Sequence, residues 1–96
     1  MKTGVVYILR CSDFSYYTGV STNLEQRLYQ HQSGVHDGYT SIRRPVELVW
    51  VSDESDIQEA IQLERQIKGW SRAKKEALIR GDFGSLVDLS KPYRDR

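Results

Sequence analysis

The chain contains little cysteine and no long apolar run. Cys11 is the one cysteine among 96 residues, which excludes an intramolecular disulfide and a thiolate-rich metal site. No segment approaches the ~20 apolar residues of a membrane span, and the N-terminus lacks the apolar run of an export signal. These absences predict a cytoplasmic protein that does not contact a membrane.

The chain is also short. Ninety-six residues with 39% hydrophobic content are enough for one domain with one modest core, but not for two domains or a deep enclosed cavity. We expect this domain to cover residues 1–85 and a short polar tail to follow over residues 86–96. Any active site is therefore expected to be open and shallow.

A clear basic excess, the usual mark of a nucleic-acid-binding domain, is missing as well, because 14 Lys and Arg face 13 Asp and Glu. The charges are nevertheless separated along the chain. Residues 53–64 contain five acids and no base, whereas residues 65–80 contain six bases and one acid. The near-neutral total is thus the sum of two opposed blocks.

Three helices are predicted from capping signals. In a capping box, a Ser or Thr side chain and a Glu or Gln three residues later each satisfy a free backbone N–H of the other. A glycine then commonly ends the helix. The predicted helices run over about residues 23–32 (Thr22 with Glu25, ended by Gly34), about residues 56–69 (Ser55 with Gln58), and from a Ser71 cap to about Arg80, before Gly81.

The remaining regular segments read as strands. Two β-branched and aromatic runs, residues 5–9 and 16–18, flank turn-forming residues 12–15, which predicts a β-hairpin. Residues 46–51 supply a third strand. The element order implies an α+β fold, with a small, mostly antiparallel three-stranded sheet flanked by helices.

The predicted helices carry titratable groups on their apolar faces. At about 100° per residue, Arg27 and His31 share the face of Leu24 on the first helix. Glu64 lies near the middle of the apolar face of the second helix. A buried charge without a partner costs several kcal/mol, so these groups must be paired, solvated in a cleft, or used in chemistry.

A purely structural interpretation also fits these residues. Arg27 and Glu64 can form a bridge between helices, and Glu64 can pair with Lys68 at the i,i+4 spacing. His31 can be a histidine whose hydrogen bonds are satisfied at the edge of the core. Tyr7 and Tyr17, one in each hairpin strand, are residues that strands commonly use for packing.

The functional interpretation rests on convergence. A domain this small must press the two tyrosines, Arg27, His31 and Glu64 together, although they come from four elements. Hydrolysis of a phosphodiester needs a base for water, a cation for the developing charge, and a carboxylate for a divalent metal. The set therefore indicates a nuclease.

The same residues resemble the GIY-YIG nuclease superfamily, in particular its small stand-alone bacterial members. Val5-Val6-Tyr7 stands at the first motif and Tyr17-Thr18-Gly19 at the second, with Val5 in place of a glycine and Thr18 in place of an isoleucine. Arg27, His31 and Glu64 follow at the expected places, and the resemblance covers roughly residues 4–80. Residues 39–40, 43–45 and 64–78 look like the stand-alone subgroup.

The resemblance implies a metal-dependent endonuclease that cleaves DNA by in-line attack of water, with a role in DNA repair or processing. Glu64 would be the one protein ligand of Mg²⁺ or Mn²⁺, and Arg27 would contact the scissile phosphate. Tyr7 or Tyr17 would take the proton of the water, which requires a depressed pKa. His31 would assist as a proton carrier or phosphate donor.

Further residues are expected to contact nucleic acid, with DNA as the expected substrate. For the basic stretch on the last predicted helices, a solvated helix face is an equal alternative. A non-catalytic nucleic-acid-binding module on the same fold would use the same surface without cleavage. A purely structural or protein-interaction domain would neither bind nucleic acid nor depend on Glu64. The expected contact residues are Gly19, Tyr39, Arg43, Arg44, Lys68, Arg72, Lys74 and Lys75.

Overall fold

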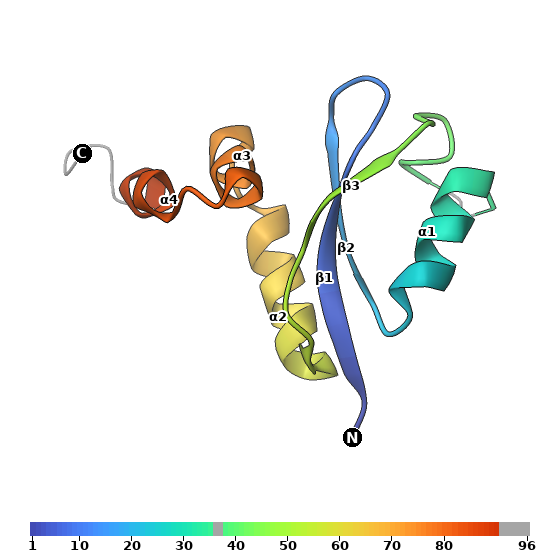
Figure 1. The fold of residues 1–96 in the computed structure, drawn as a ribbon, viewed down its shortest axis with the longest axis horizontal. Coiled ribbons are helices and arrows are strands. Elements are labelled where there is room, and N and C mark those ends of the chain that lie inside the picture. Colours follow the sequence, from blue (N-terminus) through green and yellow to red (C-terminus); the bar gives the residue numbers. More distant parts are fainter. Residues whose placement is uncertain (36–37, 91–96) are drawn as a thin grey trace.

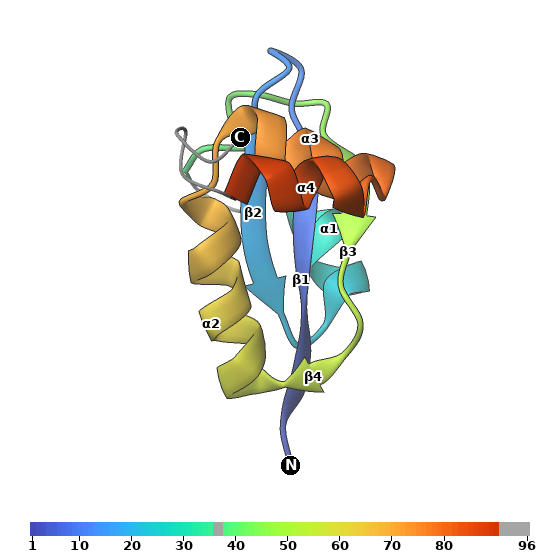
Figure 2. The same cartoon turned by 90° about the vertical axis from the view of Figure 1, so that its left-hand side faces the viewer.

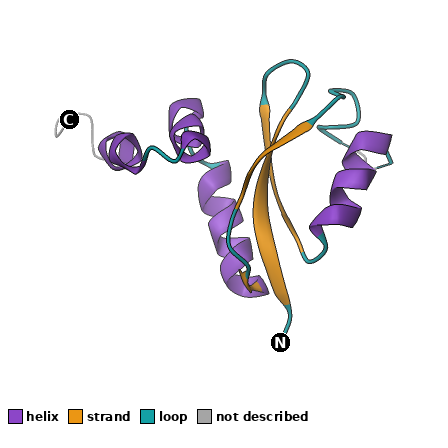
Figure 3. Ribbon diagram, viewed as in Figure 1, coloured by secondary structure: helices purple, strands orange, loops and turns teal. Residues whose placement is uncertain are grey.

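The strand β1 (Thr3–Arg10) is the centre of the sheet. In the computed structural model, which describes residues 1–35 and 38–90, β2 (Tyr16–Ser21) and β3 (Glu47–Val51) pair with β1 on either side, both antiparallel (Figures 1 and 3). The two-residue strand β4 (Ser55–Asp56) pairs with the first residues of β1 and was not predicted. The predicted hairpin, third strand and α+β class are confirmed.

Helices cover the two faces of this sheet. Helix α1 (Leu24–Ser33) lies on one side, and α2 (Ile57–Lys68) and α3 (Arg72–Arg80) lie on the other (Figure 1). Because side chains alternate along a strand, Val6 and Ile8 pack into the core on the α2 side, whereas Tyr7 and Leu9 face α1.

The α1-facing core differs in character from the α2-facing core. It contains Tyr7, Leu9, Cys11 and Val46, with the half-buried Tyr17, Leu24 and Leu28 packed against it. A polar phenol therefore lies at the centre of this small apolar cluster, where its hydroxyl needs a partner.

Two of the predicted helix caps are displaced by one residue. Helix α1 is capped by Asn23 rather than Thr22, since the Asn23 side chain accepts a hydrogen bond from the Gln26 backbone N–H at 3.1 Å. Helix α2 is likewise capped by Asp56 rather than Ser55. Asn and Asp are strong N-cap residues, so the capping-box spacing was the weaker signal.

The other helix ends agree with the prediction. Ser71 caps α3 by accepting from the Lys74 backbone N–H at 3.2 Å. Gly34 and Gly81 end α1 and α3 in the left-handed conformation, which glycine adopts without steric cost.

A fourth helix, α4 (Phe83–Ser90), corrects the predicted domain boundary. The boundary between residues 85 and 86 falls inside this helix, which packs on α3 and brings Leu86 against the α2-side core (Figure 2). Asp82 accepts from the Ser85 backbone N–H at 3.1 Å at the start of the helix, a capping signal that sequence reading missed. Residues 91–96 of the predicted tail lie outside the described residues. Among those described, no helix is long and apolar enough to cross a membrane.

We predict that Asn23→Ala lowers the free energy of unfolding by about 1 kcal/mol, because the first turn of α1 loses its cap. Urea denaturation measures the loss. Thr22→Ala is the matched control and is expected to change stability by less than about 0.5 kcal/mol, because Thr22 is exposed. A larger effect at Thr22 would contradict the assignment of the cap.

Candidate active site

Tyr7 and His31 form the buried centre of the candidate site. Both residues have 0% of their surface exposed, and the Tyr7 hydroxyl lies 2.9 Å from His31 Nε2. Tyr7 faces α1 because it follows Val6, which faces α2, in β1. His31 lies on the core-facing stripe of α1, as the helical spacing predicted. The two residues join the central strand to the helix.

Thr40 extends the hydrogen-bonded series that Tyr7 and His31 begin, and it was not predicted as a site residue. Its hydroxyl is fully buried and lies 2.7 Å from His31 Nδ1. When the Tyr7 phenol donates to Nε2, Nδ1 carries the imidazole proton and donates it to Thr40. A buried histidine needs a partner for each nitrogen, but nothing in the sequence shows which residue of the following loop supplies it.

Tyr17 covers this buried pair from the neighbouring strand. Its ring centroid lies 5.1 Å from that of His31 and 6.2 Å from that of Tyr7. Tyr17 is half-buried, whereas Tyr7 and His31 are fully enclosed. Of the two tyrosines, Tyr17 is therefore the one that can meet a substrate, and His31 reaches a substrate only through other residues.

Gly19 makes room for the Tyr7 hydroxyl. The two residues are opposite each other in the β1–β2 register, and a Cβ at Gly19 would lie 2.5 Å from the Tyr7 hydroxyl oxygen. This separation is well inside van der Waals contact, so the position requires glycine. Gly19 is buried, and its lack of a side chain shapes the site around the Tyr7 hydroxyl.

The electrostatics of Tyr7 differ from the expectation of a depressed pKa. Burial is the main cause that raises the pKa of Tyr7 well above its ordinary value, and the charge of Tyr17, a side-chain hydrogen bond with Tyr17 and the charge of Glu64 act in the same direction. The positive charge of Arg27 acts in the opposite direction and is outweighed. Tyr7 therefore stays a neutral phenol, and Arg27 and Glu64 are both near enough for their charges to act on it.

Glu64 lies on the inner side of α2 and has an ion-pair partner. Its side chain is 13% exposed, and its Oε1 atom lies 3.3 Å from Lys68 Nζ. This is the i,i+4 pair that the structural interpretation expected. Lys68 contacts Glu64 and keeps 63% of its side chain exposed.

The donor set suits a weakly held magnesium or manganese ion. Within residues 1–35 and 38–90, no three His, Cys, Asp or Glu side chains are grouped as a metal cluster. Mg²⁺ needs no such cluster, because it keeps several waters and binds one or two carboxylates together with substrate phosphates. The single carboxylate of Glu64, which is partly exposed, fits that mode.

The loop before β3 extends the site toward solvent. Tyr39 stacks on Tyr17 with ring centroids 6.4 Å apart, and the Arg43 guanidinium lies 3.8 Å from the Tyr39 ring centroid. The structure therefore brings Tyr39 and Arg43, both predicted to contact nucleic acid, beside Tyr17. Arg44 differs: it donates to the Ser41 carbonyl oxygen, and its guanidinium packs against Gly34 at the end of α1.

The basic residues of α3 lie along a second surface. Arg72 lies over the Tyr16 ring, with 4.6 Å from its Cζ atom to the ring centroid, and Lys74 lies over Trp70 at 4.4 Å. Burial, followed by the charge of Lys68, lowers the pKa of Lys75. Arg72 and Lys74 thus contact aromatic rings other than Tyr7 and Tyr17. This face of α3 is therefore partly packed rather than simply solvated.

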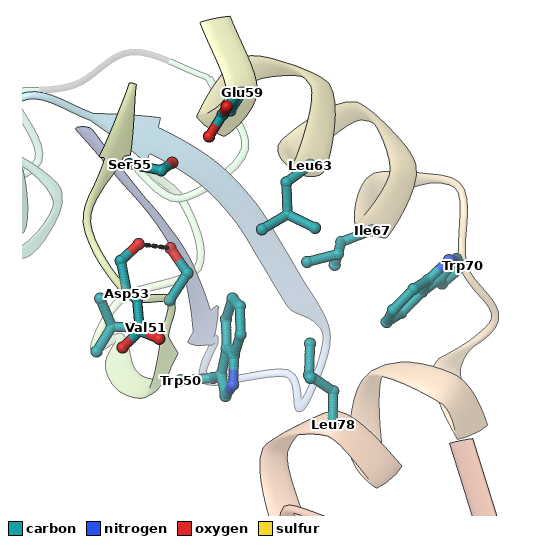
Figure 4. A pocket seen from close by; sticks show the side chains of 10 residues that line it. Trp50, Val51, Asp53, Ser55, Glu59, Leu63, Ile67, Trp70 and Leu78 are labelled. Atoms are coloured by element: carbon teal, nitrogen blue, oxygen red, sulfur yellow. Dashed lines mark hydrogen bonds between the residues drawn. The ribbon is translucent and has the colours of Figure 1, made fainter. Parts of the chain in front are cut away.

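An apolar groove occupies the other face of the sheet. It has a volume of about 640 Å³ and lies between β3, α2 and α3, with Trp50, Leu63 and Trp70 directed toward it (Figure 4). None of the predicted site residues lines this groove. The groove and the Tyr7 cluster are therefore separate features.

Comparison with known proteins agrees with this geometry. The GIY-YIG catalytic domain family matches residues 3–77 of the chain. The chain belongs to the GIY-YIG family. This is a nuclease family whose members generally depend on a divalent metal, and the resemblance predicted from the sequence is confirmed.

The GIY-YIG domain has relatives of similar length. A UPF0213 protein from Natronomonas pharaonis is 44% identical over 79 residues, which cover 82% of this chain and 93% of the relative. A second UPF0213 protein, from Staphylococcus saprophyticus, is 43% identical over 79 residues, which cover 82% of this chain and 96% of the relative. The solution NMR structure of a UPF0213 protein from Bacillus halodurans has a TM-score of 0.53 and 36% identity, covering 94% of this chain and 99% of its own. The solution NMR structure of a protein from E. faecalis has a TM-score of 0.58 and 30% identity, and the match covers 86% of this chain and 88% of that protein.

One altered motif position in this GIY-YIG domain lies away from the tyrosines. Thr18 pairs with Ile8 and therefore faces the α2 side of the sheet, opposite Tyr7. Its hydroxyl is buried and has no hydrogen-bond partner among the described residues. Threonine in place of isoleucine thus changes packing, and the hydroxyl of Tyr7 keeps its surroundings.

We predict that Thr40→Val destabilises the GIY-YIG domain by about 1–3 kcal/mol, because His31 Nδ1 loses its buried partner while the side-chain volume stays nearly constant. Urea unfolding measures the change. Thr40→Ser keeps the hydroxyl and is the matched variant. Equal losses in the two variants would show that the hydrogen bond is unimportant.

The raised pKa of Tyr7 predicts a loss of stability in alkali. The unfolded chain ionises this phenol near pH ~10, whereas the folded chain does not, so the free energy of unfolding falls as pH rises above that value. The slope from this group approaches about 1.4 kcal/mol per pH unit. Unfolding of wild type and Tyr7→Phe between pH 9 and pH 11 (roughly the titration range of tyrosine) measures it, and identical slopes would rule out this origin.

Proposed function

We propose that this GIY-YIG domain is a metal-dependent endonuclease that hydrolyses DNA phosphodiester bonds in DNA repair or processing in the cytoplasm. The observation that carries the proposal is the buried chain Tyr7–His31–Thr40, which meets the half-buried Tyr17 within the electrostatic reach of Arg27 and Glu64. Such a chain supplies a positioned proton acceptor beside the place where a substrate is admitted.

The proton path follows from burial. Tyr7 is fully enclosed and its pKa is raised, so it does not act as a free phenolate toward water. Tyr17 takes the proton of the attacking water as its own hydroxyl proton passes to Tyr7, and the Tyr7 proton passes to His31 Nε2. Thr40 holds the imidazole in the tautomer whose Nε2 lone pair accepts that proton.

Charge on the phosphate is met from two sides. As water oxygen bonds to phosphorus, the bond to the leaving oxygen breaks and negative charge builds on the phosphoryl oxygens. Arg27 offers a planar guanidinium to those oxygens. Glu64 would hold Mg²⁺ or Mn²⁺, which when bound supplies positive charge to the scissile phosphate.

A non-catalytic nucleic-acid-binding module is the second candidate. The Glu64–Lys68 ion pair favours it, because Lys68 already neutralises the carboxylate that a metal requires. In such a module the Tyr7–His31 bond serves packing alone, and the basic residues bind DNA without cleavage. The two candidates differ in their dependence on Glu64.

We predict that Glu64→Gln and Arg27→Ala each slow plasmid nicking about 100-fold, the usual scale for removing one group that stabilises a transition state. The assay compares supercoiled plasmid in Mn²⁺, Mg²⁺ and EDTA. Glu59→Gln is the matched control, because it changes an exposed carboxylate on the same helix.

Circular dichroism and thermal unfolding establish that the variants are folded. Full activity in Glu64→Gln would reject the endonuclease and leave the binding module. Plasmid binding by wild type without nicking in any metal would have the same consequence.

A further inference from the structure

The tip of the β1–β2 hairpin holds an aromatic ring in solvent at a conformational cost. Phe14 has φ of 65°, the left-handed region, and in the described ranges no other residue apart from glycines has positive φ. For an L-residue this conformation costs about 1–2 kcal/mol, which glycine avoids. The ring is 66% exposed, so burial offers little compensation.

The turn itself is firmly built. The Phe14 backbone N–H donates to the Cys11 carbonyl oxygen at 2.9 Å, and the Cys11 N–H donates to the Ser15 carbonyl oxygen at 2.8 Å. The Asp13 carboxylate also accepts from the Ser15 backbone N–H at 3.0 Å. The ring is therefore carried on an ordered backbone, which lowers the entropy cost of using it in binding.

Two arginines from separate segments hold the tip from either side. Arg43 Nε lies 3.1 Å from the Asp13 carboxylate, and Arg72 Nη1 donates to the Phe14 carbonyl oxygen at 2.6 Å. Arg43 belongs to the loop before β3, and Arg72 is the first residue of α3, on the other side of the hairpin (Figure 1). The turn that carries the exposed ring is consequently contacted by two guanidinium groups.

This combination matches a polynucleotide with unstacked bases. Single-stranded nucleic acid is bound by aromatic rings on which bases stack, together with cations that follow the phosphates. A base inside a duplex presents no free face to a protruding ring. An exposed ring on a turn that two arginines contact also suits a polyanion better than an apolar protein surface.

The hairpin tip is continuous with the candidate active site. Arg43 lies over Tyr39, and Tyr39 stacks on Tyr17. Phe14 is three residues from Tyr17, so their Cα atoms are at most about 11 Å apart. At about 3.4 Å per stacked nucleotide, this upper bound corresponds to about three nucleotides at most.

We propose that Phe14 stacks on an unpaired nucleobase within about three nucleotides of the scissile phosphate. The preferred substrate is then nucleic acid with a single-stranded segment beside the cleavage point, as in a flap, a junction or a free single strand. The inference rests on the proposed nuclease function and names its substrate class.

The test is fluorescence anisotropy in EDTA with a labelled single-stranded oligodeoxynucleotide and with its blunt duplex. Wild type is expected to bind the single strand more tightly. Phe14→Gly removes the ring and tolerates the left-handed backbone, and it should weaken single-strand binding about tenfold, within the range for one base–aromatic stack, with duplex binding unchanged. Phe14→Trp should restore the affinity.

Phe83→Ala is the matched control, because it removes another exposed phenylalanine, 65% exposed, on α4. Thermal unfolding checks that each variant is folded. Equal single-strand affinity in Phe14→Gly and wild type would overturn the inference, as would an equal loss on duplex or a wild type without single-strand preference. Because EDTA prevents metal-dependent cleavage, absence of nicking rejects the nuclease independently of this result.

Discussion

The hydrogen bonds of one buried imidazole constrain the whole candidate site. His31 is fully enclosed, and its two nitrogens are satisfied by Tyr7 from the central strand and Thr40 from the loop after α1. Leaving either nitrogen without a partner in this core would cost about 1–3 kcal/mol, so strand, helix and loop are held in one arrangement. Gly19 has to lack a side chain because Tyr7 must reach that imidazole.

The same burial decides how the tyrosines divide their roles. Enclosing Tyr7 fixes its hydroxyl against His31 but raises its pKa, so rigid placement and ionisation oppose each other at this residue. Tyr17 is only half-buried, and its ring contacts both Tyr7 and His31. In the proposed mechanism, Tyr17 receives the proton from water and Tyr7 passes a proton to the His31 imidazole. Neither tyrosine then needs a depressed pKa.

Residues whose role depends on periodicity were predictable from the sequence. Helical spacing placed His31 and Glu64 on inner faces, and both are there, because a helix fixes the direction of each side chain once its face is known. Thr40 was not predictable, since it comes from a loop without periodicity and gains its role only through a tertiary contact. The Asn23 cap was missed because adjacent candidate caps differ by about a few tenths of a kcal/mol. Helix α4 was missed because its apolar pattern is weak and its packing on α3 stabilises it.

Two arginines, one in the loop before β3 and one on α3, already pair with carboxylates in the free protein, and this explains how a chain of net charge +1 suits a polyanion. Arg43 pairs with Asp13 and Arg72 with Glu76, both at partly exposed positions. Exposed ion pairs contribute about 0–1 kcal/mol each, so a phosphate displaces such a carboxylate at small cost. Arg44 differs, because its guanidinium packs on Gly34 and bonds to the loop backbone, and withdrawing it would loosen the segment that carries the imidazole's partner. Arg43 and Arg72 are therefore arginines that a substrate can recruit at small cost, and both contact the turn that carries the exposed ring of the hairpin.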